Sequence, residues 1–438
     1  MSYIKRHIED VIKDALSEKG AVCVTGARQV GKSTTLKENF PAFKEASLDD
    51  SRLLRLALEY PEEFFVQFSP PVFVDEIQYA PSLFSSIKLY LDKIGTKSTE
   101  GNSGTISGEG TKPNKDNKGM FLLSGSQRYE MMSGITESLA GRVNLIDLYG
   151  LSTREIRAEN FREPFLPTRD YCVRRNPEPL EYHEIWGNIW RGFFPELVRD
   201  SMSLPDKLPN GFAWQRFYSS YMRTYLDRDV SKLANVGDLL QFERFMTAMA
   251  ARTGQLLNLA EVAKDVRINH ATAQRWLSVL VASGIVFLLQ PYHNNHLKRI
   301  IKTPKVYFLD TGLACYLLGW ENPEVLQNGA MSGALFETFV FAEILKSWVN
   351  SSGVTPIANV FFYRDKDGNE IDLLIKHNGT LYPIEIKKHV GCRKQDISAF
   401  AQIDRIPDMQ RGEGCVICMA SDALPITDKD RAIGVSYL

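Results

Sequence analysis

The chain has no excess of charge of either sign. Lysine and arginine number 52, aspartate and glutamate number 53, and the formal net charge is -1. This balance excludes a uniformly basic coat of the kind that holds nucleic acid by charge alone. The chain also has 44% hydrophobic and 24% charged residues, which is ordinary for globular proteins and excludes a wholly disordered or fibrous chain.

Cysteine and histidine are sparse as well. The six cysteines are scattered and do not show the regular spacing of a disulfide-rich domain. This excludes a fold held together by disulfides and favours a reducing compartment. Cys415 and Cys418 form a lone C-x-x-C in an apolar run that is predicted to be a buried strand, so a structural pair is favoured over a redox or zinc site. The seven histidines show no metal-ligand spacing with the cysteines.

Long apolar runs are missing. The longest uncharged run, residues 276–292, is shorter than the roughly 20 residues that a membrane helix needs. The first residues, MSYIKRHIEDVIKDAL, are typical of a charged amphipathic helix and lack the apolar centre of a secretory signal. We therefore expect a cytoplasmic protein with no membrane partner.

The length of 438 residues predicts several folded segments, at roughly 100 to 200 residues per domain. Over residues 21–150, short β-branched runs alternate with helical stretches, which predicts an α/β fold with a parallel sheet covered on both faces. Residues 96–119 are rich in glycine, serine, lysine and asparagine, and they are predicted to form a mobile inserted loop. The expected segment boundaries are 1–155, 156–235, 236–325 and 326–438, of which 156–235 is predicted to be a helical linker or lid.

A phosphate-binding loop is the clearest motif. Residues 26–33, GARQVGKS, match G-x-x-x-x-G-K-[ST] between an apolar strand and a helix, which is the context that this motif requires. The glycines let the backbone wrap phosphates, Lys32 can reach the β- and γ-phosphates of ATP, and Ser33 is expected to bind Mg²⁺. The predicted nucleotide contacts are Gly26, Ala27, Arg28, Gln29, Val30, Gly31, Lys32, Ser33 and Thr34.

Further candidate residues follow the next strands. Residues 71–76, PVFVDE, end in two carboxylates, of which Asp75 can hold Mg²⁺ and Glu76 can orient or deprotonate an attacking water. The strand at 121–124 precedes Gln127, a polar side chain that can hold this water near the γ-phosphate. Arg142 is either a charge-stabilising arginine for a second copy of the chain or a surface residue in an ion pair.

The order GARQVGKST, VFVDEIQ, LLSGSQ and ESLAGR resembles the AAA+-type P-loop ATPases of bacteria and archaea that carry a winged-helix segment and a C-terminal nuclease-like domain. The later runs WRGFFPE and TYLDRDV extend this likeness over nearly the whole chain, whereas the insertion at 96–119 departs from it. The resemblance implies ATPase activity, with residues 26–33 as Walker A, Asp75 and Glu76 as Walker B, and Ser126 or Gln127 as sensor.

A helix pair in the middle of the chain has the pattern of a winged helix. Residues 258–266 begin with a capping Asn258, and a second helix is predicted over 271–283 with Ala273, Trp276, Leu277, Leu280 and Val281 on its apolar face. Thr272 and Arg275 would then point outward, at the spacing of a recognition helix. Two strand-like runs, 285–290 and 305–309, follow the helices.

Charge is uneven along this chain. Residues 250–305 contain eight basic and two acidic residues, and eight minus two gives a formal charge of +6. Lys298, Arg299 and Lys302 lie between the two strand-like runs, and together with Thr272 and Arg275 they are the predicted DNA contacts. The alternative is that the winged helix docks on protein.

The last part of the chain carries an acidic and lysine constellation. Glu337 lies on a predicted helix, Asp372 lies on a strand, and Glu385 and Lys387 share one face of the next strand after a turn at Asn378 and Gly379. Two carboxylates can hold Mg²⁺ while the lysine activates water, which suits phosphodiester cleavage. The arrangement resembles the PD-(D/E)xK, or restriction-endonuclease-like, fold, and an inactive scaffold of that fold is the alternative.

Together, these patterns and the resemblance predict an AAA+-type ATPase domain over 1–155 that depends on ATP and Mg²⁺. Its nucleotide state is expected to control a DNA-binding winged helix over 236–325 and a nuclease-like module over 326–438. The expected partners are ATP, DNA and a second copy of the chain. The alternative function is a non-catalytic, ATP-gated regulator or protein-binding scaffold with a degenerate nuclease-like domain.

Overall fold

The structure, a computed structural model, describes residues 3–97, 118–126, 135, 138–204, 207–226, 239–293, 303–406 and 409–438. The chain divides into two compact units. The N-terminal unit contains Lys5–Tyr149 and Ser352–Val354, and the C-terminal unit contains Met1–Ile4, Gly150–Ser351 and Thr355–Leu438. Most of the predicted insertion, residues 98–117, lies outside the described ranges. Within those ranges, no helix has both the length and the apolar character that a membrane crossing requires.

The N-terminal unit is built on a parallel five-stranded sheet, as the alternating pattern predicts. The strand order is β2-β3-β4-β1-β5, and every pairing in it is parallel. The strands are β1 (Ala21–Thr25), β2 (Lys44–Ser47), β3 (Val72–Asp75), β4 (Phe121–Gly125) and β5 (Val143–Asp147). Because the carboxyl ends of parallel strands meet at one edge, the residues that follow β1, β3 and β4 are brought together there.

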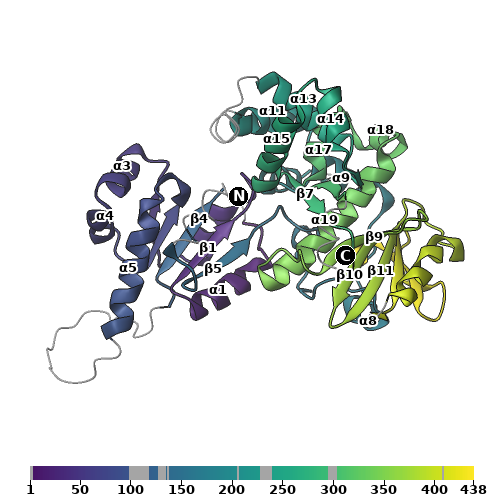
Figure 1. Cartoon of the computed structure of the whole chain (residues 1–438), viewed down its shortest axis with the longest axis horizontal. Helices are drawn as coiled ribbons and strands as arrows, with labels where there is room; N and C mark the ends of the chain where they lie inside the picture. The colour runs from purple at the N-terminus through teal and green to yellow at the C-terminus, as the bar shows by residue number, and fades with distance from the viewer. Residues whose placement is uncertain are drawn as a thin grey trace. The chain divides into compact units, whose positions relative to one another are not determined.

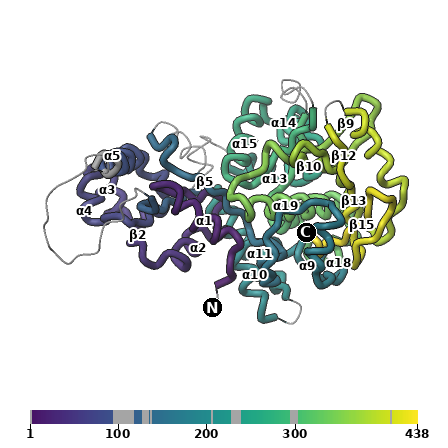
Figure 2. Tube along the Cα trace, turned by 90° about the horizontal axis from the view of Figure 1, so that it is seen from below, coloured from purple at the N-terminus to yellow at the C-terminus, as the bar shows by residue number. Residues whose placement is uncertain are grey.

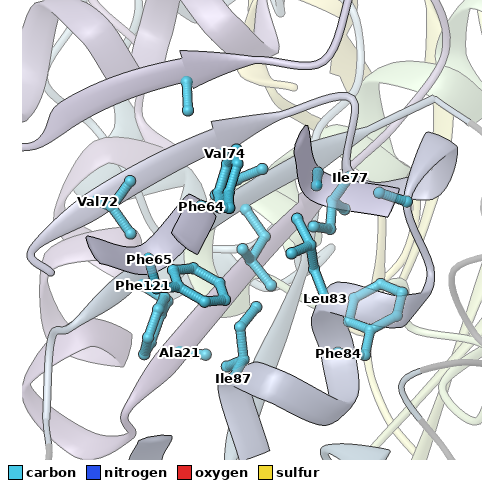
Figure 3. Close-up of a cluster of buried hydrophobic side chains, with 14 of the residues drawn as sticks. Ala21, Phe64, Phe65, Val72, Val74, Ile77, Leu83, Phe84, Ile87 and Phe121 are labelled. Atoms are coloured by element: carbon cyan, nitrogen blue, oxygen red, sulfur yellow. The ribbon is translucent and has the colours of Figure 1, made fainter. Parts of the chain in front are cut away.

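Helices cover both faces of this sheet. They are α1 (Ile8–Glu18), α2 (Lys32–Asn39), α3 (Ser51–Glu59), α4 (Pro61–Gln67), the short 3₁₀ turn η1 (Ile77–Tyr79) and α5 (Ser82–Lys97). Side chains of α4 and α5, including Phe64 and Ile87, pack with Ala21, Val74 and Phe121 in one buried cluster (Figure 3). On the other face, α1 packs against β1 and β5, which it flanks in Figure 1.

The C-terminal unit begins with helices. They are α7 (Thr153–Ile156), α8 (Arg169–Arg175), α9 (Tyr182–Arg191), α10 (Pro195–Ser201), α11 (Gly211–Tyr225), α13 (Leu239–Ala250), α14 (Leu259–Asp265), α15 (His270–Ala282), α17 (Thr311–Leu318), α18 (Pro323–Asn328) and α19 (Ser332–Ser352). The helix α19 is almost entirely buried, as expected for a helix at the centre of a unit.

Two sheets complete this unit. A three-stranded sheet has the order β6-β8-β7, with β6 (Gln255–Leu256), β7 (Val286–Leu289) and β8 (Lys305–Phe308). A mixed sheet has the order β14-β15-β13-β11-β10-β9, with β12 beside β11, and forms the light green to yellow part of Figures 1 and 2. Its elements are β9 (Val360–Arg364), β10 (Glu370–His377), β11 (Thr380–Ile386), the 3₁₀ helix η3 (Lys394–Arg405), β12 (Gln410–Arg411), β13 (Gly414–Cys418), β14 (Leu424–Pro425), β15 (Asp430–Gly434) and η4 (Val435–Tyr437).

Local sequence signals explain several of these elements. The predicted turn at Asn378 and Gly379 is confirmed: both residues have positive φ, and β10 and β11 pair antiparallel on either side of it. The predicted buried strand around Cys415 and Cys418 is confirmed as β13, in which every residue is buried. One prediction about α15 is wrong, because Val279 is buried in its apolar face whereas Val281 is 39% exposed.

Candidate functional site

The predicted phosphate loop joins β1 to α2 at the carboxyl edge of the parallel sheet. Its backbone needs glycine at two places. A Cβ atom on Gly26 would lie 2.1 Å from the carbonyl oxygen of Leu148, and Gly31 has φ of 96° where it caps α2. Gln29 also has a left-handed backbone, with φ of 59°. The loop is therefore tightly wound immediately before a helix N-terminus, which is the geometry that phosphate binding uses.

Lys32 is held inside this loop. Its side chain is only 6% exposed, and Nζ donates to the carbonyl oxygens of Gly26, at 3.0 Å, and Ala27, at 2.8 Å. Arg6 supports the loop from behind, since its guanidinium donates to the carbonyl oxygens of Val30, at 3.0 Å, and Tyr149, at 2.8 Å. The sequence offers no signal for Arg6, which is 2% exposed although the residues around it are charged.

Oxygen ligands converge beside Lys32. The hydroxyl of Ser33 donates to Asp75 and lies 2.9 Å from each of its carboxylate oxygens. Ser124, at the end of β4, also donates to Asp75. Hydroxyl and carboxylate oxygens are the donors that Mg²⁺ prefers, so these residues fit that ion. Ser124 was not among the predicted site residues, although its place at the end of a parallel strand is a usable signal.

Glu76 follows β3 in a left-handed conformation, with φ of 56° and ψ of 43°. Such a backbone is costly for a non-glycine residue. Its Oε2 accepts hydrogen bonds from the side chains of Gln78 and Ser126, the second at 3.4 Å. Asp75 and Glu76 are therefore neighbours in sequence with separate sets of contacts.

Two other predicted residues have different outcomes. Gln127 lies outside the residues that the structure describes. Arg142 makes a bidentate ion pair with Asp92, with N–O distances of 2.7 and 3.1 Å. This contact favours the surface ion pair over a role toward a second copy of the chain, and that role stays a prediction.

The acidic constellation of the C-terminal unit is brought together around a lysine that the sequence did not suggest. Nζ of Lys305, from β8, lies 3.2 Å from Glu337, 2.7 Å from Glu370 and 3.5 Å from Asp372. Lys305 is 3% exposed. Tyr307, two residues further along the same strand, donates to Glu337 at 2.6 Å. The predicted acids thus surround an ammonium group.

Glu385 and Lys387 lie at the same cluster. Nζ of Lys387 is 2.6 Å from Glu385, and Asp372 accepts a hydrogen bond from the backbone N–H of Ile386, between these two residues, at 2.9 Å. Sequence reasoning missed Lys305, Tyr307 and Glu370. The usable signal was the alternation of side chains along β8, which places Lys305 and Tyr307 on the same face of the strand. This alternation does not identify the residues that this face contacts.

Burial and mutual repulsion shift the protonation of these acids. Burial, followed by the charge of Asp372, raises the pKa of Glu337 to about 7 and that of Glu385 to about 8. Burial alone would lower the pKa of Lys305, but the surrounding carboxylates raise it above its usual value. Among the described residues, no group of three or more histidine, cysteine, aspartate or glutamate side chains is arranged to hold a metal.

The predicted DNA contacts are only partly described. On α15, Arg275 is exposed and Thr272 is half-buried, whereas Lys298, Arg299 and Lys302 lie outside the described residues. Of the eight basic residues in the stretch with charge +6, Lys305 is buried among carboxylates outside the stretch. Arg252 lies 2.5 Å from Asp265 and 4.0 Å from Glu261, the two acids already subtracted in that count. The burial of Lys305 therefore makes the exposed positive charge smaller than the sequence count.

Comparisons with family models match the N-terminal part of the chain to a described domain and the rest to domains of unknown function. Residues 18–157 match the family described as "AAA domain". Residues 183–324 and 332–438 match two families that are each described as a domain of unknown function (DUF8612 and DUF4143). The match over 18–157, together with the parallel sheet and its phosphate loop, supports an AAA-type ATPase domain.

Similar proteins and solved structures were found over most of the chain. Uncharacterized proteins of Mycobacterium bovis and Mycobacterium tuberculosis are each 26% identical over 378 residues, which are 86% of this chain and 72% of theirs. Among solved structures, a Walker-type ATPase of Pyrococcus abyssi aligns over 72% of this chain and 96% of its own, with 12% identity and a TM-score of 0.44.

Proposed function

We propose that the protein binds and hydrolyses ATP and uses the nucleotide state as a switch. The observation that carries this proposal is the convergence of Lys32, Ser33 and Asp75 at one end of the parallel sheet. Lys32 donates to carbonyl oxygens of the phosphate loop, and Ser33 donates to Asp75. Nζ of Lys32 donates to two neutral backbone carbonyls of this loop. Its ammonium can exchange those carbonyls for phosphate oxygens.

The residues divide the work of phosphoryl transfer. The loop amides and Lys32 bind and orient the phosphates, and Ser33 and Asp75 would hold Mg²⁺, which neutralises developing charge when bound. Glu76 would orient the attacking water or accept its proton, and its hydrogen-bond partners differ from those of Asp75. Ser126 holds the Glu76 carboxylate. The rival proposal, a regulator that binds ATP without turnover, uses the same binding residues but needs no general base.

ATP affinity tests the binding step. Lys32→Ala is expected to weaken ATP binding by about 10- to 100-fold, since a hydrogen bond to a charged group contributes about 1.5–3 kcal/mol. The measurement is isothermal titration of the full chain with ATP and Mg²⁺. Lys37→Ala is the matched control, because Lys37 lies on the same helix, is half exposed and pairs with Glu45. Equal affinity of Lys32→Ala and wild type would contradict the assignment.

We also propose that α14, α15 and the three-stranded sheet form a winged helix that binds DNA. Support comes from the order of these elements and from Arg275, whose side chain is exposed on α15 two helical positions from the buried Ala273. The contacts would be mainly to phosphates, because the exposed polar residues of this helix are Arg275, His270, Gln274 and Ser278, of which only Arg275 carries a permanent charge.

Binding to duplex DNA at low salt tests this second role. Arg275→Glu is expected to weaken binding and to reduce the slope of log affinity against log salt by about one, the effect of one lost phosphate contact. Arg405→Glu is the control, since Arg405 is an exposed arginine on η3, outside the helix pair. Unchanged retention of DNA by Arg275→Glu, with the same salt dependence, would exclude α15 as the contact.

For the acidic constellation, we propose a nuclease-like scaffold that does not cut DNA. The support is Lys305, whose ammonium lies among Glu337, Glu370 and Asp372 where a cation would be held. Because the ammonium of Lys305 occupies the space among these carboxylates, no cleavage step is derived for them. Plasmid cleavage in Mg²⁺ or Mn²⁺ that disappears in Asp372→Ala would contradict the scaffold proposal.

A further inference from the structure

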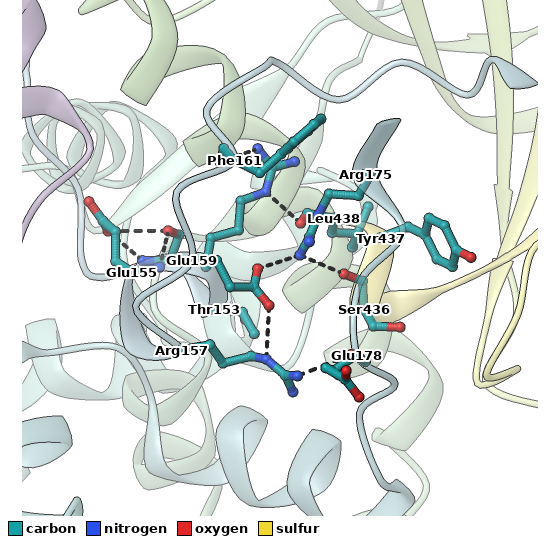
Figure 4. Close-up of polar contacts among 12 residues, drawn as sticks. Thr153, Glu155, Arg157, Glu159, Phe161, Arg175, Glu178, Ser436, Tyr437 and Leu438 are labelled. Carbon is teal, nitrogen blue, oxygen red and sulfur yellow. Dashed lines mark hydrogen bonds and ion pairs between the residues drawn. The ribbon is translucent and has the colours of Figure 1, made fainter. Parts of the chain in front are cut away.

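Buried polar side chains of folded proteins normally have hydrogen-bond partners. In the C-terminal unit, for example, the buried carboxylate of Glu155 accepts from the backbone N–H and the hydroxyl of Ser152, at 2.8 and 3.2 Å (Figure 4). This pair caps the start of α7 and so stabilises the local fold. Gln78, in the N-terminal unit, differs from this pattern and lies beside Glu76.

Only half of the Gln78 amide is paired. The side chain is 3% exposed, and its Nε2 donates to Oε2 of Glu76. Its Oε1 is buried and has no hydrogen-bond partner among the residues that the structure describes. Because an ionised carboxylate only accepts hydrogen bonds, the amide cannot turn this oxygen toward Glu76. An unpaired buried acceptor lowers the stability of a fold, so stability alone does not explain a glutamine here.

The turn that carries Gln78 is anchored in the core. The backbone N–H of Tyr79 donates to the carbonyl oxygen of Glu76 at 3.1 Å, which closes the 3₁₀ turn η1. Ile77 (Figure 3) and Ala80, on either side of this turn, belong to the buried cluster of the N-terminal unit. These contacts fix the backbone around Gln78, so its amide is held in place beside the Glu76 carboxylate.

Both hydrogen bonds to the side chain of Glu76 are made to the same oxygen. Oε2 accepts from Nε2 of Gln78 and from the hydroxyl of Ser126, which lies 3.4 Å away. Within the described part of the chain, no group donates to Oε1. Glu76 itself is half-buried, whereas Gln78 and Ser126 are each 3% exposed. The protein therefore fixes one oxygen of this carboxylate and leaves the lone pairs of the other for a water molecule.

We propose that Gln78 is a positioning residue for Glu76 and that its amide is required for rapid ATP hydrolysis. The inference rests on the proposed function, in which Glu76 is the general base. With Oε2 held by Gln78 and Ser126, Oε1 accepts a proton from the attacking water. The water oxygen forms a bond to the γ-phosphorus, and the bond from this phosphorus to the bridging oxygen breaks, with its electron pair passing to ADP.

Gln78→Met tests this role, because methionine has a similar shape but no amide. We expect kcat for ATP hydrolysis to fall about ten-fold or more, since a displaced base loses part of its contribution of about 10²- to 10⁴-fold. KM for ATP is expected to stay within about two-fold of wild type, because the residues assigned to bind phosphate are intact. The melting temperature should equal or exceed that of wild type, because the substitution removes a buried oxygen without a partner.

Two further variants separate positioning from a structural role. Gln67→Met is the matched control, since Gln67 is an exposed glutamine at the end of α4 in the same unit, and it should keep wild-type kcat and melting temperature. The double variant Glu76→Gln with Gln78→Met should turn over ATP no more slowly than Glu76→Gln alone. Two residues that act through one another are not additive, and once the base is gone there is nothing left to position.

The outcomes distinguish this inference from the proposed function. Suppose wild type hydrolyses ATP at least about 100-fold faster than Glu76→Gln. Unchanged or faster turnover by Gln78→Met would then overturn the role of Gln78 and leave hydrolysis intact. A lower melting temperature of Gln78→Met, or a further ten-fold loss in the double variant, would assign Gln78 a structural role and also overturn the inference. Turnover by wild type no faster than by Glu76→Gln would contradict hydrolysis itself, and the positioning role would fall with it.

Discussion

Replacing Lys305 with methionine is expected to lower the free energy of unfolding of the C-terminal unit by about 3–5 kcal/mol. The reason is that removal of one partner from a buried ion cluster leaves uncompensated charge. Lys305 is 3% exposed and lies within 3.5 Å of three carboxylates, so methionine would keep most of the packing but none of the charge. The measurement is urea unfolding of the full chain, followed by tryptophan fluorescence.

The loss should depend on pH in a defined direction. Glu337 and Glu385 have pKa values raised to about 7 and about 8 in the folded state, so the folded protein binds more protons than the unfolded chain above the ordinary value of 4.5. Stability from these groups is present below that value and is lost as pH rises through 7 to 8. Lys305→Met is therefore expected to cost less at pH 6, where protons replace the ammonium, than at pH 8.

A matched control separates charge loss from the loss of any lysine. Lys366 is exposed in the turn between β9 and β10, and Lys366→Met is expected to change stability by no more than about 0.5 kcal/mol. Equal stability of Lys305→Met and wild type at pH 8 would contradict the interpretation of Lys305 as the internal counter-ion of the acids.

Local sequence motifs allowed much of the N-terminal unit to be predicted. The phosphate loop is contiguous, and its glycines at 26 and 31 encode a backbone that few other residues adopt, so the pattern predicted both the loop and its place between a strand and a helix. The positions of Asp75 and Glu76 were predictable for a similar reason. They end a buried strand, and the ends of parallel strands lie at the edge of the sheet where the phosphate loop is.

The remaining contacts depended on residues distant in sequence. Lys305, on β8, reaches Glu337, on the helix α19, and the alternation of β8 does not identify the partner of a buried lysine. Arg6 looks like part of a solvated charged segment, yet it is buried behind the phosphate loop. The predicted apolar face of α15 included Val281, but the structure buries Val279 instead. These two residues flank the same apolar face on opposite sides, and only tertiary packing decides which of them is covered.

Glu76→Gln is expected to reduce ATP turnover by about 10²- to 10⁴-fold, which is the usual contribution of a general base. The amide has the same shape as the carboxylate but cannot accept a proton, and the residues assigned to bind phosphate and Mg²⁺ are unchanged. ATP affinity is therefore expected to stay within a few-fold of wild type. Glu59→Gln is the control, because Glu59 is an exposed carboxylate at the end of α3 in the same unit.

The most direct test of ATP hydrolysis is steady-state release of inorganic phosphate from ATP by wild type, Glu76→Gln and Glu59→Gln, each with Mg²⁺ and with EDTA. We expect Mg²⁺-dependent turnover in wild type and Glu59→Gln, and a rate at least about 100-fold lower in Glu76→Gln. Release of phosphate by wild type no faster than by Glu76→Gln would contradict hydrolysis at this site and favour a regulator that only binds ATP.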